Sequence, residues 1–271
     1  MSDQGGDSQS LLDDFENEAP LHLVPRRVIT ADGSSQNNDQ VIGESPVALV
    51  FNGISHAVMM ATPADLEDFI VGFALCEGLI GRRSDIVDIE LRPTKMGIEV
   101  DATTTNRLAE SMRARRRSMM GPSGCGICGV ESLSQVDREL PEVEKGPTPS
   151  MAAIKRACDQ FANHQTYAGV TSGAHAAAWC QSNGDIICVR EDVGRHNAMD
   201  KLIGSRQPES SEEFVIVSSR ASFELVVKAA MAGCSSLVAM SAPTSLAIRK
   251  AKQTRLNLIA FASGDRCVCY S

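Results

Sequence analysis

The stretch FVIVSSRASFELVVKAAMAGCSSLVAMSAPTSLAIRKAKQTRLNLIAFA, residues 214–262, decides the fold. Three short apolar runs alternate here with two longer segments in which apolar residues recur at helical spacing. Strand–helix–strand–helix–strand order is typical of parallel βαβ units with right-handed crossovers. We therefore predict parallel strands at 214–218, 236–241 and 256–262, and helices at 222–232 and 244–254.

A loop rich in hydroxyl groups or arginine follows each strand, at 218–222, 241–245 and 263–266. In an open parallel sheet, ligands bind beyond the carboxyl ends of the strands. Two of the loops open helices, whose free N–H groups and dipoles favour phosphate. Ordinary helix capping by Ser222 and Thr244 would explain the same residues without a ligand. The chain has neither a dinucleotide-binding fingerprint nor a P-loop, so both interpretations stay open.

Upstream of this stretch we expect a helix at 151–163 and a β-hairpin with strands at 171–179 and 185–190. Asn183-Gly184, between the two strands, is a strong hairpin signal. His175 lies in the first strand, where it either lines a site or is a core histidine with satisfied hydrogen bonds.

Directly after the hairpin comes the polar segment REDVGRHNAMDK, residues 190–201. Two interpretations have equal weight for its charged side chains. They orient a ligand, or they form a buried network that attaches the hairpin to the next helix. The residues in question are Glu191, Asp192, Arg195, His196 and Asp200.

The first half of the chain predicts an antiparallel αβ lobe. Two β-prone runs at 47–51 and 54–60 flank Asn52-Gly53, again a hairpin signal. Thr62-Pro63 is expected to cap a helix that closes at Gly78. Short strands at 86–91 and 96–100 and a helix at 106–117 complete the lobe.

The segment GPSGCGICG, residues 121–129, holds Cys125 and Cys128 between four glycines. Arg107, Arg113 and the arginines at 115–117 precede it. Neighbouring positive charges favour the thiolate, which is the nucleophilic form of cysteine, so the sequence predicts a reactive sulfur loop. Half of a structural zinc site, a thioredoxin-type redox pair and an inert loop are the competing interpretations.

Composition limits the remaining possibilities. The chain has 271 residues, 43% of them hydrophobic, and a formal net charge of −8, which argues against broad nucleic-acid or membrane-surface binding. Nine cysteines without a disulfide-framework pattern indicate free thiols in the cytoplasm. We expect a disordered acidic tail at 1–19, an N-terminal lobe at 20–120, the CxxC loop and linker at 121–150, and an α/β domain at 151–271.

Five motifs in order, GCGICG, TSGAHAA, REDVGRHNAMDK, SSRASFELVVKA and SAPTSLAI, closely resemble the FdhD family of formate dehydrogenase accessory sulfurtransferases. The resemblance extends from Val41 to the C-terminus. It implies an α/β fold, α+β overall, in which a cytidine-deaminase-like three-layer α/β/α domain carries a smaller N-terminal αβ lobe.

The resemblance also implies a function, that of a sulfur carrier acting through a cysteine persulfide. A cysteine desulfurase would load sulfur onto the CxxC loop, with Cys125 as the carrier and Cys128 assisting or sharing the role. The sulfur would pass to the molybdenum or tungsten bis(guanine dinucleotide) pterin cofactor, which is then inserted into formate dehydrogenase. A homodimer, with no permanently bound metal and no nucleic-acid or membrane partner, would suit the family.

The family's guanine-dinucleotide contact matches a short segment near the C-terminus of this chain. That segment often carries an additional basic residue where this chain has Ser263. From the predicted sheet edge we add Ser219, Arg220, Thr244, Arg195 and His196 to the cofactor-binding residues. The family segment itself consists of Phe261, Ala262, Ser263, Gly264, Asp265 and Arg266.

Two rival functions remain. A zinc hydrolase of the deaminase type needs His-x-Glu followed by Pro-Cys-x-x-Cys, but here the CxxC precedes His175 and Ala177 occupies the position of the glutamate. The other rival is a non-catalytic cofactor-binding chaperone with a structural zinc on the CxxC, with Cys267 and Cys269 as candidate further ligands.

Overall fold

The computed structural model of the chain describes residues 19–105, 140–263 and 265–271. The expected acidic tail, except for Ala19, lies outside the described residues. So do the helix at 106–117, the arginine cluster, the CxxC loop with most of its linker, and Gly264.

The C-terminal half forms a six-stranded sheet of order β12-β11-β10-β9-β7-β8. Strands β9 (Phe214–Val217), β10 (Ser236–Ala239) and β11 (Asn257–Ser263) are parallel, which confirms the predicted alternation. β7 (His175–Cys180) pairs antiparallel with both β8 (Ile186–Asp192) and β9. The first strand starts at His175, later than expected, because 168–171 form the short helix α6 (Ala168–Thr171). An unforeseen edge strand, β12 (Arg266–Cys269), runs antiparallel to β11.

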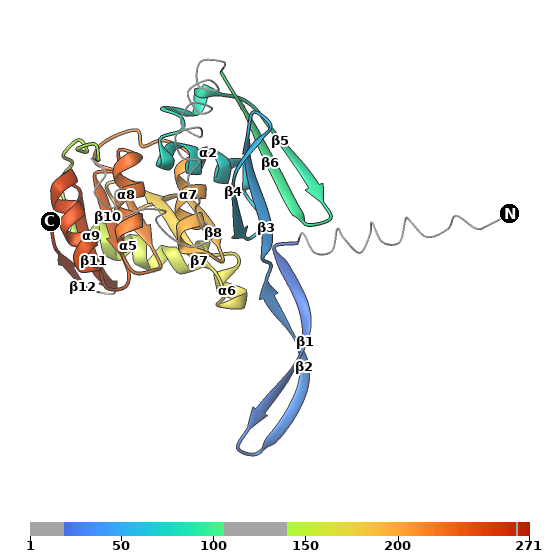
Figure 1. Ribbon diagram of the computed structural model, residues 1–271. Coiled ribbons are helices and arrows are strands. Elements are labelled where there is room, and N and C mark those ends of the chain that lie inside the picture. Colours follow the sequence, from blue (N-terminus) through green and yellow to red (C-terminus); the bar gives the residue numbers. More distant parts are fainter. Residues whose placement is uncertain (1–18, 106–139, 264) are drawn as a thin grey trace.

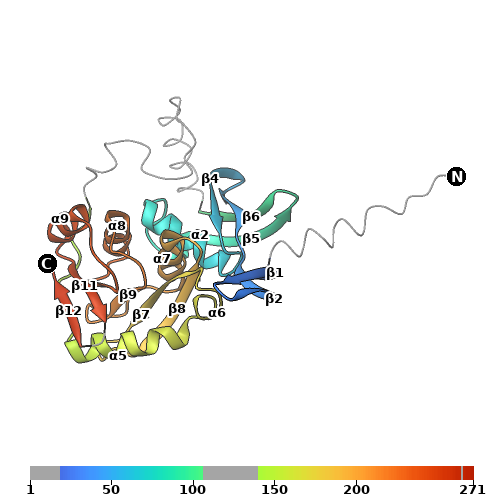
Figure 2. The same cartoon turned by 90° about the horizontal axis from the view of Figure 1, so that it is seen from below.

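Helices cover both faces of this sheet, which makes three layers (Figures 1 and 2). On one face lie α7 (Arg195–Ser205), α8 (Phe223–Met231) and α9 (Ser245–Thr254). On the other lies α5 (Met151–Phe161), which the short 3-10 turn η2 (Ala162–His164) follows. Successive residues of β9–β11 pack alternately into the two cores, because side chains along a strand point to opposite faces. The α/β character is therefore observed, and the cytidine-deaminase-like description stays a prediction.

The N-terminal lobe is a four-stranded sheet of order β4-β3-β6-β5 with the helix α2 (Leu66–Glu77) against it. Asn52-Gly53 turns the hairpin between β3 (Ser45–Phe51) and β4 (Ile54–Ala61), as predicted. A second hairpin joins β5 (Ile86–Thr94), which follows the 3-10 turn η1 (Arg83–Asp85), to β6 (Gly97–Thr104). The expectation of a purely antiparallel lobe is wrong, because β3 and β6 pair in parallel.

The prediction that Thr62 caps the first helix is also wrong. The N-cap is Asp65, in a left-handed conformation with φ 52°. Thr62 is fully buried, and its hydroxyl accepts a hydrogen bond from the backbone N–H of Val193 at 3.1 Å. A partner 131 residues away holds this threonine, so the local capping signal was misleading.

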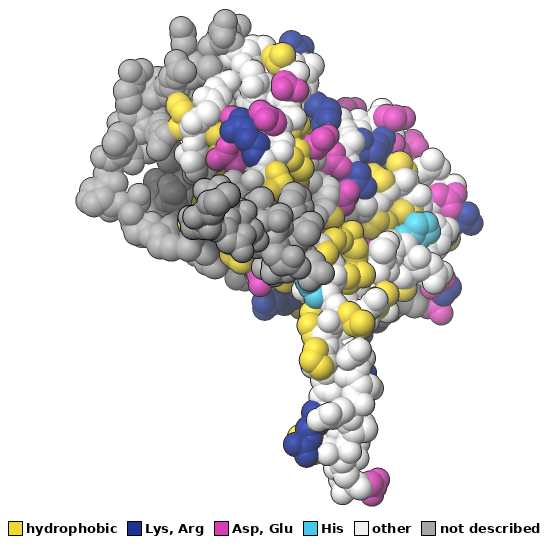
Figure 3. Space-filling model, turned by 90° about the vertical axis from the view of Figure 1, so that its right-hand side faces the viewer, with side chains coloured by type: hydrophobic (Ala, Val, Ile, Leu, Met, Phe, Trp, Pro, Cys, Tyr) yellow, Lys and Arg dark blue, Asp and Glu magenta, His cyan; other side chains and the backbone are white. Residues whose placement is uncertain are grey.

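An antiparallel two-stranded ribbon of β1 (Leu21–Thr30) and β2 (Gly33–Ile42) projects from the body (Figures 1 and 3). Both of its outer edges lack a partner strand among the described residues. Leu23 is 66% exposed and Ile29 is 75% exposed. No part of the sequence reasoning anticipated this ribbon.

The two lobes meet where α2 crosses α7 at two glycines. A Cβ atom placed on Gly72 would lie 1.7 Å from the carbonyl oxygen of Asp200, and one on Gly204 would lie 1.8 Å from that of Asp68. Real Cβ atoms essentially never come closer than 3.0 Å to another heavy atom. The helices therefore pack backbone to backbone, and only glycine fits at either position.

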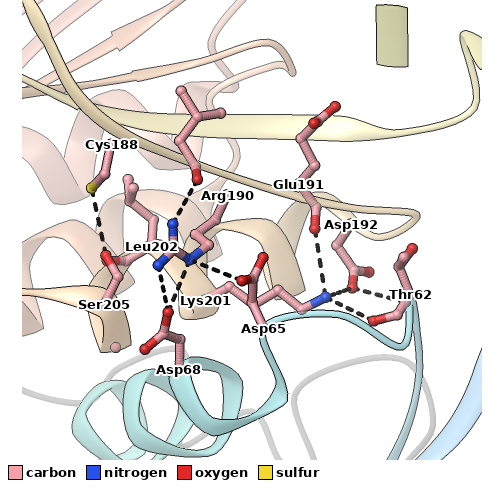
Figure 4. A network of polar contacts seen from close by, with 12 residues as sticks. Thr62, Asp65, Asp68, Cys188, Arg190, Glu191, Asp192, Lys201, Leu202 and Ser205 are labelled. Atoms are coloured by element: carbon pink, nitrogen blue, oxygen red, sulfur yellow. Dashed lines mark hydrogen bonds and ion pairs between the residues drawn. The ribbon is translucent and has the colours of Figure 1, made fainter. Parts of the chain in front are cut away.

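Buried charges cross the same boundary (Figure 4). Lys201 Nζ lies 2.7 Å from Asp192 Oδ2 and donates a hydrogen bond to the carbonyl oxygen of Thr62 at 2.8 Å. Asp192 Oδ2 also accepts from the Thr62 N–H at 2.9 Å. Arg190 contributes a further interlobe bond, from its Nη2 to Asp68 at 2.7 Å. Since both side chains of the Lys201–Asp192 pair are fully buried, each ion depends on the other for its solvation.

These contacts decide between the two interpretations of residues 190–201. Glu191 accepts hydrogen bonds from the backbone N–H groups of Thr166, Tyr167 and Ala168, and so anchors the segment that opens α6. Asp192 and Asp200 are held by Lys201 and Lys228 respectively. A structural network thus accounts for the three carboxylates, whereas Arg195 and His196 take no part in it.

Replacing Lys201 by methionine will lower the free energy of unfolding by about 3 to 5 kcal/mol, because Asp192 is left buried and without its partner ion. The matched control is Lys155→Met, since Lys155 is 44% exposed and pairs with Asp159 at 3.4 Å. Such an exposed pair is worth less than about 1 kcal/mol. Urea denaturation of both variants measures the difference, and equal losses would contradict the assigned role of Lys201.

Candidate functional site

The three loops predicted to converge lie side by side at the carboxyl edge of the parallel strands. Backbone hydrogen bonds connect them: the N–H of Thr244 donates to the carbonyl oxygen of Ala221 at 3.0 Å, and the N–H of Phe261 donates to that of Ser241 at 3.2 Å. The resulting edge is a continuous surface formed by the loops after β9, β10 and β11.

The antiparallel strands bring further residues to this edge. β7 runs opposite to β9, so its first residue, His175, lies at the carboxyl end of β9 and pairs with Asp192, the last residue of β8. The Ser218 hydroxyl accepts a hydrogen bond from the N–H of Ala176 at 3.0 Å. Helix α7 begins three residues after Asp192, so the N-termini of α7, α8 and α9 all face the same edge. Their dipoles make it favourable for negative charge.

Helix capping explains one of the two candidate caps and leaves the other unexplained. Thr244 Oγ1 accepts from the N–H of Ala247 at 3.2 Å, an ordinary N-cap bond. Ser222 occupies the N-cap position of α8 but makes no such bond. Its hydroxyl oxygen is buried and makes no hydrogen bond of ordinary length in the described part of the chain, although it lies close enough to Glu224 to lower the pKa of that carboxyl.

Two neighbouring side chains share this property. Arg195 Nε and His196 Nε2, in the first turn of α7, are buried atoms without a hydrogen-bond partner in the described part of the chain. An unsatisfied buried polar group costs about 1 to 3 kcal/mol. Each of the three atoms therefore has hydrogen-bonding capacity that the described residues do not fully use.

Glu224, in the first turn of α8, lies beside His196 and Ser222. Its Oε2 is 3.6 Å from His196 Nε2, and its side chain is 39% exposed. The neighbouring His196 lowers the pKa of this carboxyl to about 2, with smaller contributions from its own backbone N–H and from the Ser222 hydroxyl, against the opposing effect of burial. Glu224 is therefore ionised at neutral pH. The sequence analysis did not include Glu224 among the candidate site residues, although an acidic residue in the first turn of a helix predicted at this edge could have indicated it.

His175 lies close to the same group. Burial lowers the pKa of its imidazole, and the nearby side chains of Arg195 and His196 lower it further. Since its ordinary value is about 6.5, His175 is neutral at pH 7. His175 is half-buried and lies at the start of β7, at the edge, so of the two roles considered for it, lining the site fits its position.

The segment expected to contact the guanine dinucleotide lies at the far end of the edge. Phe261 is 40% exposed and has a left-handed backbone with φ 53°. Ala262 is buried, whereas Ser263 and Arg266 are exposed and pair across the turn from β11 to β12. Asp265 lies 3.6 Å from Lys155 of α5, on the opposite face of the sheet from α7–α9.

Of the remaining expected residues, Ser219 is buried and donates its hydroxyl to the carbonyl oxygen of Arg220 at 3.1 Å. Arg220 is exposed at the same edge. The structure thus distributes the described residues that were expected to bind the cofactor along one edge of the sheet, with Asp265 turned toward Lys155 on the opposite face. Their binding role stays a prediction.

Three of the described cysteines are core residues. Cys76, Cys180 and Cys234 are buried, and burial raises the pKa of each thiol, that of Cys234 to about 12. They are protonated, unreactive core residues. In the part of the chain that the structure describes, no group of three or more His, Cys, Asp or Glu residues could hold a metal ion. Cys267, which was considered above as a candidate zinc ligand, has its Sγ atom 3.6 Å from Met151 Sδ.

None of the helices described is both long enough and apolar enough to span a membrane.

Comparison with known proteins gives a consistent result. The model of the FdhD/NarQ family matches residues 42–271. The chain is 46% identical over 252 residues to the sulfur carrier protein FdhD of Variovorax paradoxus, covering 92% of this chain and 91% of that protein. It is 46% identical over 237 residues to the protein of the same name from Acinetobacter baylyi, with 86% of each chain covered.

A solved structure shares the fold. A formate dehydrogenase accessory protein from Desulfotalea psychrophila, as its crystal structure is described, superposes with a TM-score of 0.74 at 23% sequence identity. The match covers 93% of this chain and 96% of that one.

Proposed function

This chain belongs to the FdhD/NarQ family, and from that premise we propose that it is a sulfur carrier required for formate dehydrogenase activity. The observation that carries the proposal is the match of residues 42–271, because this range includes both Cys125 and Cys128. Relatives 46% identical are named sulfur carrier proteins, and the structural neighbour is described as a formate dehydrogenase accessory protein.

The proposed chemistry begins at Cys125. Its thiolate attacks the sulfane sulfur of a persulfide on a cysteine desulfurase. A new S–S bond forms on Cys125, the S–S bond of the desulfurase breaks, and the desulfurase cysteine leaves as a thiolate. The arginines at 113 and 115–117 favour the attacking thiolate by lowering its pKa. Cys128 assists or shares the carrier role.

The recipient is the molybdenum bis(guanine dinucleotide) pterin cofactor, which is a substrate of this protein and is afterwards inserted into formate dehydrogenase. The sheet edge supports this part of the proposal. Three helix N-termini and the exposed Arg220 and Arg266 suit the phosphates of the cofactor. Arg195 Nε, His196 Nε2 and the Ser222 hydroxyl make no hydrogen bond of ordinary length among the described residues and could bind polar groups of the same ligand. We place the protein in the cytoplasm, where both enzymes would meet it, and propose that it acts as a homodimer.

Intact-mass measurement tests the carrier step directly. Wild-type protein incubated with a cysteine desulfurase and free cysteine should gain one sulfur atom, about 32 Da, that cyanide removes. Cys125→Ala should gain none, whereas Cys269→Ala, which removes an exposed thiol, should load like the wild type. Unchanged loading of the Cys125 variant, or stoichiometric zinc held by untagged protein in place of sulfur, would contradict the proposal.

A further inference from the structure

We propose that Cys267, Cys269 and Met151 form a binding site for a soft monovalent metal ion, copper(I). The site lies on the face of the six-stranded sheet that α5 covers, opposite to α7–α9 (Figure 2). It uses neither Cys125 nor Cys128, so the inference goes beyond the proposed function and does not depend on it.

The two cysteines lie on the same side of the edge strand β12. Only Val268 separates them, and side chains along a strand alternate between the two faces of the sheet. Cys269 pairs with Ile259, and Cys267 packs against the hydrophobic core that contains Ile259 and the buried residues of α5. Burial and the neighbouring thiol of Cys269 raise the pKa of the Cys267 thiol, which agrees with two adjacent sulfur atoms. One strand therefore places two thiols side by side.

The third sulfur atom comes from a different element. Met151 is the first residue of α5, 116 residues before Cys267, and its Sδ atom lies 3.6 Å from Cys267 Sγ. Two sulfur atoms that are each about 2.3 Å from one metal ion in tetrahedral geometry are about 3.8 Å apart. The observed separation is close to that of two ligands of one ion. The Cys267 thiol donates a weak hydrogen bond to Met151 here, and a metal ion in place of the proton would keep the two atoms in contact.

The number and kind of these donors determine which metal fits. Structural zinc sites are almost always four-coordinate, whereas the part of the chain that the structure describes contains no group of three His, Cys, Asp or Glu residues that could hold a metal ion. Two thiolates and a thioether are soft ligands, which favour copper(I). On binding, two metal–sulfur bonds form and the two thiol protons pass to water, so the ion keeps its oxidation state.

The site is open to an entering ion. Met151 and Cys267 are half-buried, and Cys269 is exposed. A metal ion would therefore bind at the surface without local unfolding of β12.

A disulfide between Cys267 and Cys269 is the competing use of the same thiols. In a regular antiparallel strand, the Cα atoms of residues i and i+2 are about 6.8 Å apart, the upper limit of the usual range for a disulfide. β12 is regular here, because Cys269 and Val268 pair with consecutive residues of β11. Closing the bond would bend β12 away from β11, whereas a metal ion bridges the two thiols without moving the backbone.

Competition with a coloured copper(I) chelator, under reducing and oxygen-free conditions, measures the affinity. The parent protein is the full chain with Cys125→Ala and Cys128→Ala, because a CxxC pair also binds soft metals. With protein in excess over the chelator, it should remove one copper(I) ion per chain. Adding Cys267→Ala and Cys269→Ala should weaken binding by about a hundredfold or more, because both thiolates are lost.

Met151→Leu tests the third ligand. It removes the thioether but keeps nearly the same volume, so the fold should be retained, which circular dichroism verifies. We expect copper(I) binding about tenfold weaker than in the parent protein. The matched control is Met96→Leu, since Met96 is 84% exposed in the turn between β5 and β6. X-ray absorption of the loaded parent protein should show three sulfur ligands and no nitrogen or oxygen ligand.

The proposal is overturned if the parent protein leaves copper(I) with the chelator, or if replacement of Cys267 and Cys269 does not change the affinity. Equal binding by Met151→Leu and Met96→Leu, or nitrogen and oxygen ligands in the absorption spectrum, would contradict the assigned ligand set. Failure of the sulfur-carrier function is a separate result. It is measured as sulfur uptake by Cys125 in the intact-mass assay, and the parent protein of the copper(I) experiment lacks that thiol.

Discussion

Formate dehydrogenase will stay inactive in a host that lacks its own accessory protein when the chain supplied carries both Cys125→Ala and Cys128→Ala. The expected loss is complete, because the sequence has no second CxxC pair and no other cysteine that follows such a run of arginines. The buried cysteines of the described residues are kept protonated by their surroundings. Each single variant will be impaired, Cys125→Ala more than Cys128→Ala, since Cys125 is the proposed carrier. Formate-dependent dye reduction in cell extracts measures the effect.

The matched control replaces thiols that are not expected to carry sulfur. A Cys267→Ala, Cys269→Ala double variant removes two cysteines from the edge strand β12 and should restore activity like the wild type. Immunoblotting verifies that all variants accumulate to equal levels. Activity in the Cys125, Cys128 double variant would show that sulfur reaches formate dehydrogenase without this pair.

The second large effect concerns the boundary between the lobes. Gly72→Ala will lower the free energy of unfolding by about 3 kcal/mol or more, and Gly204→Ala will do the same, because the added methyl group meets a backbone oxygen that no rotamer change can move. The helices would have to separate, which would also pull Thr62 and Asp68 away from Lys201 and Arg190. Urea denaturation followed by circular dichroism measures the loss.

Gly169→Ala is the control for this prediction. Gly169 lies in α6, where a Cβ atom would have nothing within 4 Å and where φ is not left-handed. Alanine there should be neutral or slightly stabilising. If Gly72→Ala were as stable as Gly169→Ala, the backbone-to-backbone packing of α2 on α7 would be wrong.

Elements defined by neighbouring residues could be predicted from the sequence. The strands β9–β11 with α8 and α9 follow from apolar periodicity, and both Asn-Gly hairpins follow from turn chemistry. Elements defined by distant partners could not. Thr62 has the local signature of a helix cap, yet its partners are Asp192 and Val193. The β1–β2 ribbon has no helical or strictly alternating apolar pattern, since most of its residues face solvent.

The same distinction applies to the site. Three convergent loops could be foreseen because parallel strands share an edge. The position of His175 at this edge depends on β7 running antiparallel to β9, which no local sequence pattern predicts. Glu224 was missed because its importance comes from His196 on another helix and not from its own sequence neighbours.

The contact between α2 and α7 bears on the proposed binding of a large cofactor. Packed interiors resist continuous deformation, so a glycine-to-glycine crossing reinforced by a buried ion pair opposes relative movement of the two lobes. A scaffold that is already rigid would lower the entropic cost of binding such a ligand at the sheet edge, because less of the framework would have to be ordered at that moment.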